Sequence, residues 1–491
     1  WLLDPFDYTL GSSEATAIVT ALEAGNNVSI STASSTNSVG SGSVAASGSE
    51  SATAGTITVD SAIVVSGSGT GNLSLIADKD IQVNAALQNL SGEGDLTLSS
   101  KTGVAINSGG SIDWDGGSGG LISISASDSG GLTGSGAIGM GSAGTSLSVS
   151  QPSGSNTIFS GSISTSGDFI KTGNGSLTLS GVNNFASAFR MNGGTIVSGN
   201  SLALDGVGKF VLNGGTLRLP ENASTGASDS VQVGSNGGTF EVDSGAVAII
   251  SVPISNEAEG VSGSLTKTGA GELQLNGTNT YTGETKISEG SLTVAGSLSD
   301  STVVDVASGA LYHLHTNDTI GSLSGTGNVN LSSSSNDHNL TAGANNQSSN
   351  FSGVLYGSGE LTKIGAGTLT LSGDNTYTYY TTIQEGALRV EGSINAGSVG
   401  VKVGSSGTYE VANSDTIAAL QGEGSVVLIG SSQLQIGSSN DAQFDGIISG
   451  TGSLAKAGSG TTTLSGVNTF SGATTINGGT LSVSGSLADS T

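Results

Sequence analysis

The three histidines of the chain are the first residues from which a site with chemistry could be built. In His313-Leu-His315, two imidazoles project from the same face of an extended strand, a spacing found in metal sites. Asp318 or Asp337 could complete such a ligand set. Exposed histidines without a ligand are the simpler interpretation, so we predict no metal site.

A second candidate is the run Asp113-Trp114-Asp115, in which two carboxylates flank an aromatic ring. Such a pair could act as general acid and base beside a sugar-stacking platform. Enzymes that cut acidic polysaccharides usually need Arg or Lys to neutralise a uronate. The only arginines, Arg190, Arg218 and Arg389, lie far from this run in the sequence. We therefore expect a loop with one exposed aromatic, and predict no catalytic and no cofactor-binding residue.

The elements that would hold these residues come from an internal repeat. The segment Leu265–Tyr281 returns as Phe169–Phe185, Leu361–Tyr377 and Leu454–Phe470. Each copy contains a marker lysine, and these are Lys171, Lys267, Lys363 and Lys456. Successive marker lysines are 96, 96 and 93 residues apart. A fixed long period of this kind is the signature of a repeat architecture.

Strand-like alternation inside each copy predicts the fold class. In Leu177-Thr178-Leu179 the leucines face inward and the threonine faces water, because alternate side chains of a strand point to opposite faces. Leu273 and the equivalent Leu292 are about 19 residues apart, about one coil of a β-helix. We predict an all-β fold, a right-handed parallel β-helix (β-solenoid) forming a single elongated rod. At roughly 20 residues per coil it would contain about 24 coils, and a 96-residue copy about five.

Three further positions recur in every copy, and a residue repeated four times indicates a scaffold rather than a catalytic site. They are the marker lysine, the asparagines Asn183, Asn279, Asn375 and Asn468, and the aromatics Phe185, Tyr281, Tyr377 and Phe470. We expect each asparagine at a turn, stacked or in the left-handed conformation. Each aromatic should plug a corner and pack on the next coil, with a carbohydrate-stacking ladder as the alternative. The lysine should pair with a carboxylate or extend over the corner. Gly173, Gly175 and Gly181 should sit at corners.

Residues 1–150 contain no copy of this repeat and form a different segment. A short helix near Ser13–Ala24, stopped by Gly25, precedes several strand-like runs. We divide the chain into an N-terminal β-helix segment (1–150), a first divergent module (151–260), a second module (261–356), a third module (357–449) and a partial fourth module (450–491). We expect the chain to be part of a longer protein.

Composition limits the possible partners. The 491 residues include 82 Gly and no Cys, and 12 basic against 38 acidic side chains give a net charge of −26. The missing cysteines exclude a disulfide framework and a thiolate metal site, and suit a protein exported unfolded. Nucleic acid needs Lys and Arg to neutralise phosphate, so it is not expected as a partner. Repeated calcium motifs are also absent.

Two resemblances become specific at this point. Over residues 1–125, the runs Trp1-Leu-Leu-Asp-Pro5, Leu22-Glu-Ala-Gly-Asn-Asn-Val-Ser-Ile30 and Asp80-Ile-Gln-Val-Asn84 resemble the repeats of filamentous-haemagglutinin-type exoproteins of two-partner secretion. Over residues 168–491, Leu265-Thr-Lys-Thr-Gly-Ala-Gly271 and Gly478-Gly-Thr-Leu-Ser-Val483 resemble the autotransporter-associated β-strand repeat (passenger-associated transport repeat). Both imply type V secretion and a location outside the cell or at the bacterial outer membrane.

The resemblances imply the structural shaft of a large secreted or surface-displayed adhesin without catalytic activity. It would present a distal binding region or assemble laterally. Implied partners are a host or neighbouring-cell surface, a glycan or a second copy of itself, and an outer-membrane translocator. Two alternatives stay open: a β-helical polysaccharide-active enzyme, and a self-assembling extracellular filament subunit.

Overall fold

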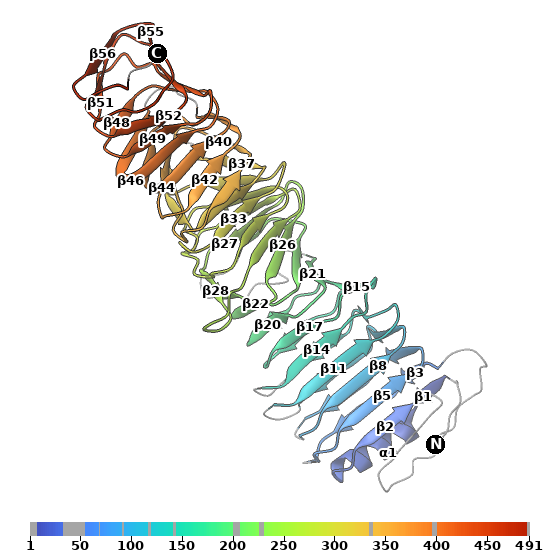
Figure 1. Ribbon diagram of the computed structural model, residues 1–491. Helices are drawn as coiled ribbons and strands as arrows, with labels where there is room; N and C mark the ends of the chain where they lie inside the picture. Colours follow the sequence, from blue (N-terminus) through green and yellow to red (C-terminus); the bar gives the residue numbers. More distant parts are fainter. Residues whose placement is uncertain are drawn as a thin grey trace. The chain divides into compact units, whose positions relative to one another are not determined.

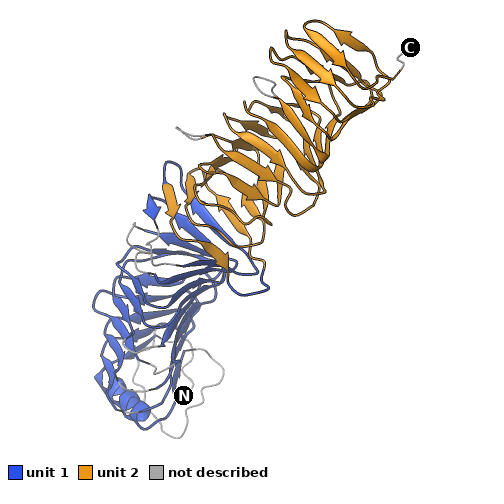
Figure 2. Cartoon of the chain, turned by 90° about the vertical axis from the view of Figure 1, so that its left-hand side faces the viewer, with its two compact units in different colours: residues 1–246, 257–261 blue, residues 247–256, 262–491 orange. Residues whose placement is uncertain are grey.

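The computed structural model consists almost entirely of parallel strands stacked in successive coils, a β-solenoid (Figure 1). It describes residues 7–32, 55–67, 69–90, 93–115, 119–140, 144–199, 207–224, 230–332, 337–394 and 400–488. The chain divides into two compact units, which are described separately (Figure 2). Unit 1 comprises residues 1–246 and 257–261, and unit 2 comprises residues 247–256 and 262–491. The predicted fold class is confirmed.

Unit 1 has three sheet faces, and most coils contribute one strand to each face. One face contains β1 (Tyr8–Leu10), β3 (Ile57–Val59), β6 (Asp80–Val83), β9 (Gly103–Ile106), β12 (Leu132–Gly134), β15 (Asn156–Phe159), β18 (Ser176–Leu179), β21 (Thr195–Ser198), β23 (Thr216–Leu219) and β26 (Gly238–Val242). Another contains β2 (Val28–Ser31), β5 (Leu73–Ala77), β8 (Leu96–Ser100), β11 (Leu121–Ala126), β14 (Ser146–Ser150), β17 (Phe169–Thr172), β20 (Ala188–Met191), β22 (Lys209–Leu212) and β25 (Val231–Val233). The last contains β4 (Ile63–Val65), β7 (Ala86–Asn89), β10 (Ser111–Trp114), β13 (Ala137–Gly139), β16 (Ile163–Thr165) and β19 (Asn184–Phe185), and a further short strand is β24 (Ala223–Ser224).

Unit 2 repeats this plan with faces that we call A, B and C. Face A contains β29 (Leu265–Thr268), β31 (Thr285–Ile287), β33 (Val303–Val306), β36 (Ser322–Gly325), β39 (Ser349–Phe351), β42 (Thr368–Leu371), β49 (Ser425–Leu428) and β52 (Ile447–Gly450). Face B contains β27 (Val247–Ile250), β30 (Glu272–Leu275), β32 (Ser291–Val294), β34 (Leu311–Leu314), β37 (Asn328–Asn330), β40 (Val354–Tyr356), β43 (Asp374–Asn375), β45 (Ser393–Ile394), β47 (Asp415–Ile417), β50 (Gln433–Ile436), β53 (Ser453–Lys456) and β55 (Thr474–Ile476). Face C contains β28 (Ile254–Asn256), β35 (Asp318–Ile320), β38 (Asn339–Ala342), β41 (Glu360–Lys363), β48 (Leu420–Gly422), β51 (Ala442–Phe444), β54 (Thr461–Leu464) and β56 (Thr480–Val483). The long strands β44 (Thr381–Val390) and β46 (Val401–Val411) run from face C round the corner into face A.

The predicted strand register is confirmed. Leu177 and Leu179 are fully buried, whereas Thr178 between them is not. Leu273 pairs with Leu292 in the next coil, which is the partner that the sequence spacing predicted. Because each coil repeats the alternation, inward leucines, valines and isoleucines form a continuous core along each unit.

Glycine permits the tight corners between the faces. Gly173 has a φ of +68°, which side chains disfavour. A Cβ on Gly181 would lie 1.9 Å from the carbonyl oxygen of Gly161 in the coil before it. Neighbouring coils therefore approach too closely at this corner for any side chain.

The three repeat copies of unit 2 begin on three different faces. Leu265 starts the second copy on face A, Leu361 the third on face C, and Leu454 the fourth on face B. On face A, the residue five coils after Leu265 is Leu369, whereas the third copy has already begun at Leu361. One copy therefore ends one face short of five whole coils, and the expected correspondence between a copy and five coils is only approximate.

The predicted number of coils was wrong, and the length of the coils explains the difference. The chain makes about 19 stacked turns, not about 24. Coils in unit 1 are longer than expected, because Leu96 pairs with Ile122 and Ile122 with Leu147, and each of these steps takes more residues than the step from Leu273 to Leu292.

The predicted N-terminal helix is confirmed as α1 (Ser12–Glu23), followed by Gly25 at φ +78°. Throughout the described residues, no helix is long and apolar enough to cross a membrane.

Candidate functional site

The marker lysines are buried inside the solenoid, which contradicts the expected carboxylate pair or extended surface position. All four are at most 1% exposed. The Lys363 ammonium donates to the carbonyl oxygens of Ile364 at 2.6 Å, Gly365 at 2.7 Å and Glu385 at 3.2 Å. Lys267 has the equivalent three acceptors, so all three N–H donors of each ammonium are used.

A glycine in the next coil closes over each of these carbonyl cages. Gly386, in the coil after Lys363, has a φ of +67°, and its Cβ would lie 2.3 Å from the Gly365 carbonyl oxygen. Gly194, Gly290 and Gly479 occupy the same position in the other copies. Burial lowers the pKa of Lys171, Lys267 and Lys363 to about 8. The groups therefore remain charged at neutral pH, held by backbone dipoles instead of a carboxylate.

The recurrent asparagines lie at corners, as predicted, and Asn279, Asn375 and Asn468 each link three consecutive coils. The Asn279 Oδ1 atom accepts the backbone N–H of Ile254 at 2.9 Å, and its Nδ2 donates to the carbonyl oxygens of Gly277 at 2.9 Å and Ser297 at 2.8 Å. The other three asparagines accept an N–H from the previous coil in the same way. None is left-handed, because Asn346 is the one non-glycine residue with positive φ in the part of the chain that the structure describes.

Two aspartates occupy the same corner position, which sequence comparison missed. The Asp318 Oδ1 atom accepts the N–H groups of Leu298 at 3.0 Å and Thr319 at 3.1 Å, and its Oδ2 accepts the Tyr312 hydroxyl at 2.5 Å. Asp415 and Tyr409 repeat the arrangement further along the chain. A signal was available, because in both pairs the aspartate follows the tyrosine at the same short interval.

Within the described part of the chain, no ion pair joins these two carboxyl groups to a cation. Asp318 and Asp415 are each 3% exposed. Burial raises the pKa of both to about 6, against the stabilising hydrogen bonds that they accept. Burial likewise raises the pKa of the Tyr312 hydroxyl, beside Asp318. The pairs are therefore uncharged or singly charged depending on pH.

The recurrent aromatics plug the corners, and the carbohydrate-stacking alternative is wrong for them. Phe185, Tyr281, Tyr377 and Phe470 are at most 2% exposed. The Tyr281 hydroxyl is 2.6 Å from the Thr285 hydroxyl in the same corner. A ring enclosed in this way has no face available to a sugar.

The Asp-Trp-Asp run is not the exposed loop that the sequence suggested. Trp114 ends β10 and is fully buried, and its indole N–H donates to the Gly94 carbonyl oxygen at 2.9 Å. Asp113 and Asp115 flank it on the partly exposed side of the strand. Both the sugar-platform and the exposed-aromatic interpretations are therefore wrong, because the ring belongs to the core.

The histidines do come together. The rings of His313 and His315 have centroids 4.5 Å apart, and the His313 Nε2 atom lies 3.0 Å from the Ser332 carbonyl oxygen. Burial and the neighbouring His313 lower the pKa of His315. Burial also lowers the pKa of His338, which is close enough to be affected by both other rings. Within the described ranges, no three His, Asp or Glu side chains are grouped so that they could hold a metal ion.

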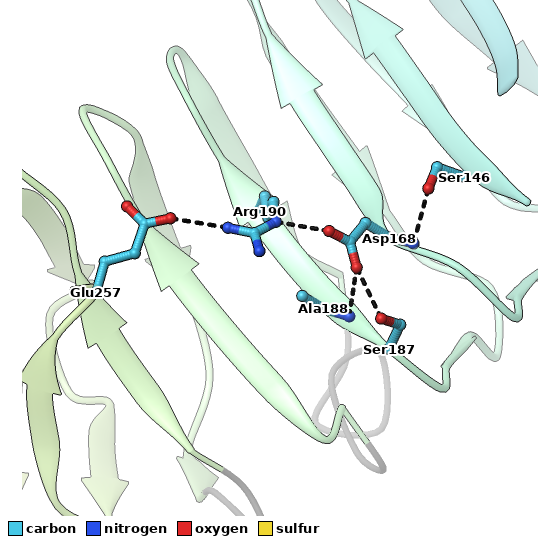
Figure 3. A network of polar contacts seen from close by, with 6 residues as sticks. All are labelled: Ser146, Asp168, Ser187, Ala188, Arg190 and Glu257. Atoms are coloured by element: carbon cyan, nitrogen blue, oxygen red, sulfur yellow. Dashed lines mark hydrogen bonds and ion pairs between the residues drawn. The ribbon is translucent and has the colours of Figure 1, made fainter. Parts of the chain in front are cut away.

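Each arginine is neutralised by two carboxylates. Figure 3 shows Arg190 between Asp168, at 2.6 Å, and Glu257, at 2.8 Å. The Asp168 carboxylate also accepts the Ser187 hydroxyl and the Ala188 N–H. Arg218 and Arg389 have equivalent carboxylate pairs. These guanidinium groups cross-link coils and are not free to bind an anionic substrate.

Comparison with known proteins agrees with the repeat. The passenger-associated-transport-repeat family matches residues 169–199, 265–294, 361–390 and 454–483. The chain is 32% identical over 248 residues to "Adhesin BmaC autotransporter" of Brucella suis biovar 1 (strain 1330), which covers 44% of this chain and 7% of that protein. No solved structure matches. The haemagglutinin-type likeness of residues 1–125 stays a prediction. The chain therefore contains four passenger-associated-transport repeats and is similar to an adhesin autotransporter, of whose length it spans about 7%.

Proposed function

We propose that this solenoid is the non-catalytic shaft of an adhesin passenger, which holds a binding region away from the bacterial outer membrane. The observation that carries the proposal is where the repeat places its distinctive side chains. Lysine cage, asparagine corner and aromatic plug are all buried and all bond to backbone or core. In each copy the recurrent polar side chains therefore join one coil to the next.

Coil-to-coil bonding of this kind suits a spacer. In a solenoid each coil contacts only its neighbours, so length can be added without rebuilding a core. Strands of adjacent coils lie about 4.8 Å apart, so extension is gained at a fixed increment per coil. The similarity to an adhesin autotransporter supports the same role. The implied partners are an outer-membrane translocator and a host or neighbouring-cell surface.

Catalysis would require a reactive side chain that is not already enclosed or bonded within the fold. Trp114 is enclosed, Arg190 is held by two carboxylates, and the recurrent lysines face carbonyl oxygens. These placements support a structural role over polysaccharide cleavage.

The test combines a turnover assay with a change of length. The purified chain should release no reducing ends from neutral or uronate-containing polysaccharides. Removal of residues 285–303, one coil in which Val304 takes the register of Thr285, should leave the rest folded and shorten the shaft by about 4.8 Å. Bacteria displaying the shortened protein should keep adhering. Turnover that disappears in Asp113→Asn/Asp115→Asn would instead establish the enzyme alternative.

A further inference from the structure

Among the residues that the structure describes, the exposed and partly exposed aromatic side chains are concentrated at one place. In the described parts every Phe and the one Trp are buried, and five of the eight tyrosines are buried as well. The remaining aromatic side chains lie with all three histidines on unit 2, along the corner between faces B and C. We call the exposed and partly exposed members of this set the aromatic corner: His313, His315, Tyr356, Tyr379 and Tyr380. His338 lies at the same corner and is buried.

Hydrogen bonds between successive coils place these residues side by side. His338 donates its backbone N–H to Leu331, whose own N–H reaches the Tyr356 carbonyl oxygen at 2.9 Å. In the next coil, the Thr378 N–H reaches the Gly357 carbonyl oxygen at 3.0 Å. The corner is therefore continuous from the histidine coil to the two tyrosines.

The fold does not require tyrosines at the end of this corner. Tyr379 and Tyr380 occupy the positions held by Gly283-Glu284 in the second copy and Gly472-Ala473 in the fourth. Tyr379 is 49% exposed, although a buried position would remove its ring from water. Lys402 lies over the Tyr380 ring, with its Nζ atom 3.8 Å from the centroid. Packing in the core therefore does not account for these two tyrosines, and we look for their role at the surface.

A column of hydrogen-bonding side chains on face B leads into the corner. Its partly exposed members pair coil by coil in the order His313, Asn330 and Tyr356, whereas Thr293, the position before them, is buried. They therefore repeat along the axis at the coil spacing of about 4.8 Å. Donors and acceptors repeated along a line, next to exposed rings, match a linear polymer that presents hydroxyl groups at regular intervals.

We propose that the aromatic corner binds a neutral saccharide chain of a host or neighbouring cell. The C–H groups on the apolar face of a pyranose pack against the negative face of an aromatic ring, and its hydroxyls bond to polar groups at the rim. A strongly anionic chain is disfavoured, since the net charge is −26 and Lys402 is the cation placed at these rings. This inference rests on the proposed adhesin function and adds a binding site to the shaft.

The test uses an array printed with neutral oligosaccharides terminating in galactose, fucose or N-acetylglucosamine, and with sialylated counterparts. The whole chain should bind neutral members. Tyr379→Gly/Tyr380→Ala, which copies Gly472-Ala473 of the fourth repeat, should fold normally and lose at least about tenfold in signal. Val467→Ala, a change at a 63% exposed residue of the same unit, should bind as the parent does.

Equal binding by parent and double variant would overturn the proposal, as would binding of sialylated members alone. Adhesion to cells that depends on the two tyrosines but survives removal of the cell-surface glycans would assign the corner to a protein partner instead. Circular dichroism tests separately whether the solenoid is folded, and the turnover assay tests separately whether it has catalytic activity. If the parent protein binds no saccharide although its solenoid is folded and shows no turnover, the site is refuted and the shaft is not.

Discussion

Replacing Asp318 by asparagine should stabilise unit 2 at neutral pH, because the protein already uses asparagine at four equivalent corners. The carboxyl group is 3% exposed, and its burial raises its pKa from an ordinary 3.8 to about 6. The folded state therefore binds the proton more tightly than the unfolded state does. As the pH rises from about 4 to about 6, the folded state must ionise a buried group, and stability falls.

The magnitude follows from the two pKa values. At about 1.4 kcal/mol for each pKa unit, the difference between 3.8 and about 6 corresponds to ~3 kcal/mol of lost stability above pH 6. Asparagine keeps an oxygen for the N–H groups of Leu298 and Thr319, and its amide can donate to a rotated Tyr312 hydroxyl. Asp318→Asn should then exceed the parent by up to ~3 kcal/mol at pH 7.5, and the two should converge near pH 4.

Scanning calorimetry of parent and variant at pH 4, 5, 6 and 7.5 measures this directly, as the difference between the melting temperatures of the transition that contains unit 2. General charge repulsion is common to both proteins and cancels in the difference. Asp337→Asn, at an exposed carboxylate of the same unit, is the matched control and should show no such trend. A variant that is less stable than the parent at pH 7.5, or a difference independent of pH, would refute the reasoning.

Three further outcomes are expected. Leu275→Asp should bury an unpaired carboxylate and cost several kcal/mol, whereas Thr178→Asp on an outward position should cost well under about 1 kcal/mol, and equal urea midpoints would show that the register is wrong. Lys363→Ala should leave three buried carbonyl oxygens without their donor and cost at least about 2 kcal/mol by thermal denaturation, against less than about 0.5 kcal/mol for the exposed Lys286→Ala. Removal of residues 361–491 should leave a folded remainder with only its last coil frayed, and complete loss of the β signal in circular dichroism would contradict nearest-neighbour stacking.

The coil itself could be predicted from sequence because its determinants are local. Alternation as in Leu177-Thr178-Leu179 sets which side chains face inward, and the offset between Leu273 and Leu292 sets the coil length. Both signals lie within a single copy. The repeated fold class therefore follows from a short stretch of sequence.

The roles of the polar residues could not be predicted, because they depend on the coil before or after. The buried Lys363 ammonium finds its third carbonyl oxygen in the next coil, at Glu385. Asp318 was not recognised as a corner residue because its partner Leu298 belongs to the preceding coil and its residue type differs from the recurrent asparagine. Trp114 was misjudged because two flanking aspartates suggested exposure, although alternation in a strand allows a buried ring between them.

A repeat copy ends one face short of five whole coils. A change in the number of copies therefore alters both the length of the solenoid and the face on which each downstream strand lies. Repeated segments such as Leu265–Tyr281 and Leu361–Tyr377 invite unequal recombination, which adds or removes one whole copy. Within unit 2 these two copies start one face apart, so losing the residues between their starting points rejoins matching sequence but turns everything downstream by a third of a revolution about the axis. A deletion or duplication that spans Leu265 to Leu369 covers five whole coils, so it would leave the downstream strands on their original faces. Variation in copy number would then move a lateral site downstream of the change around the axis as well as along it.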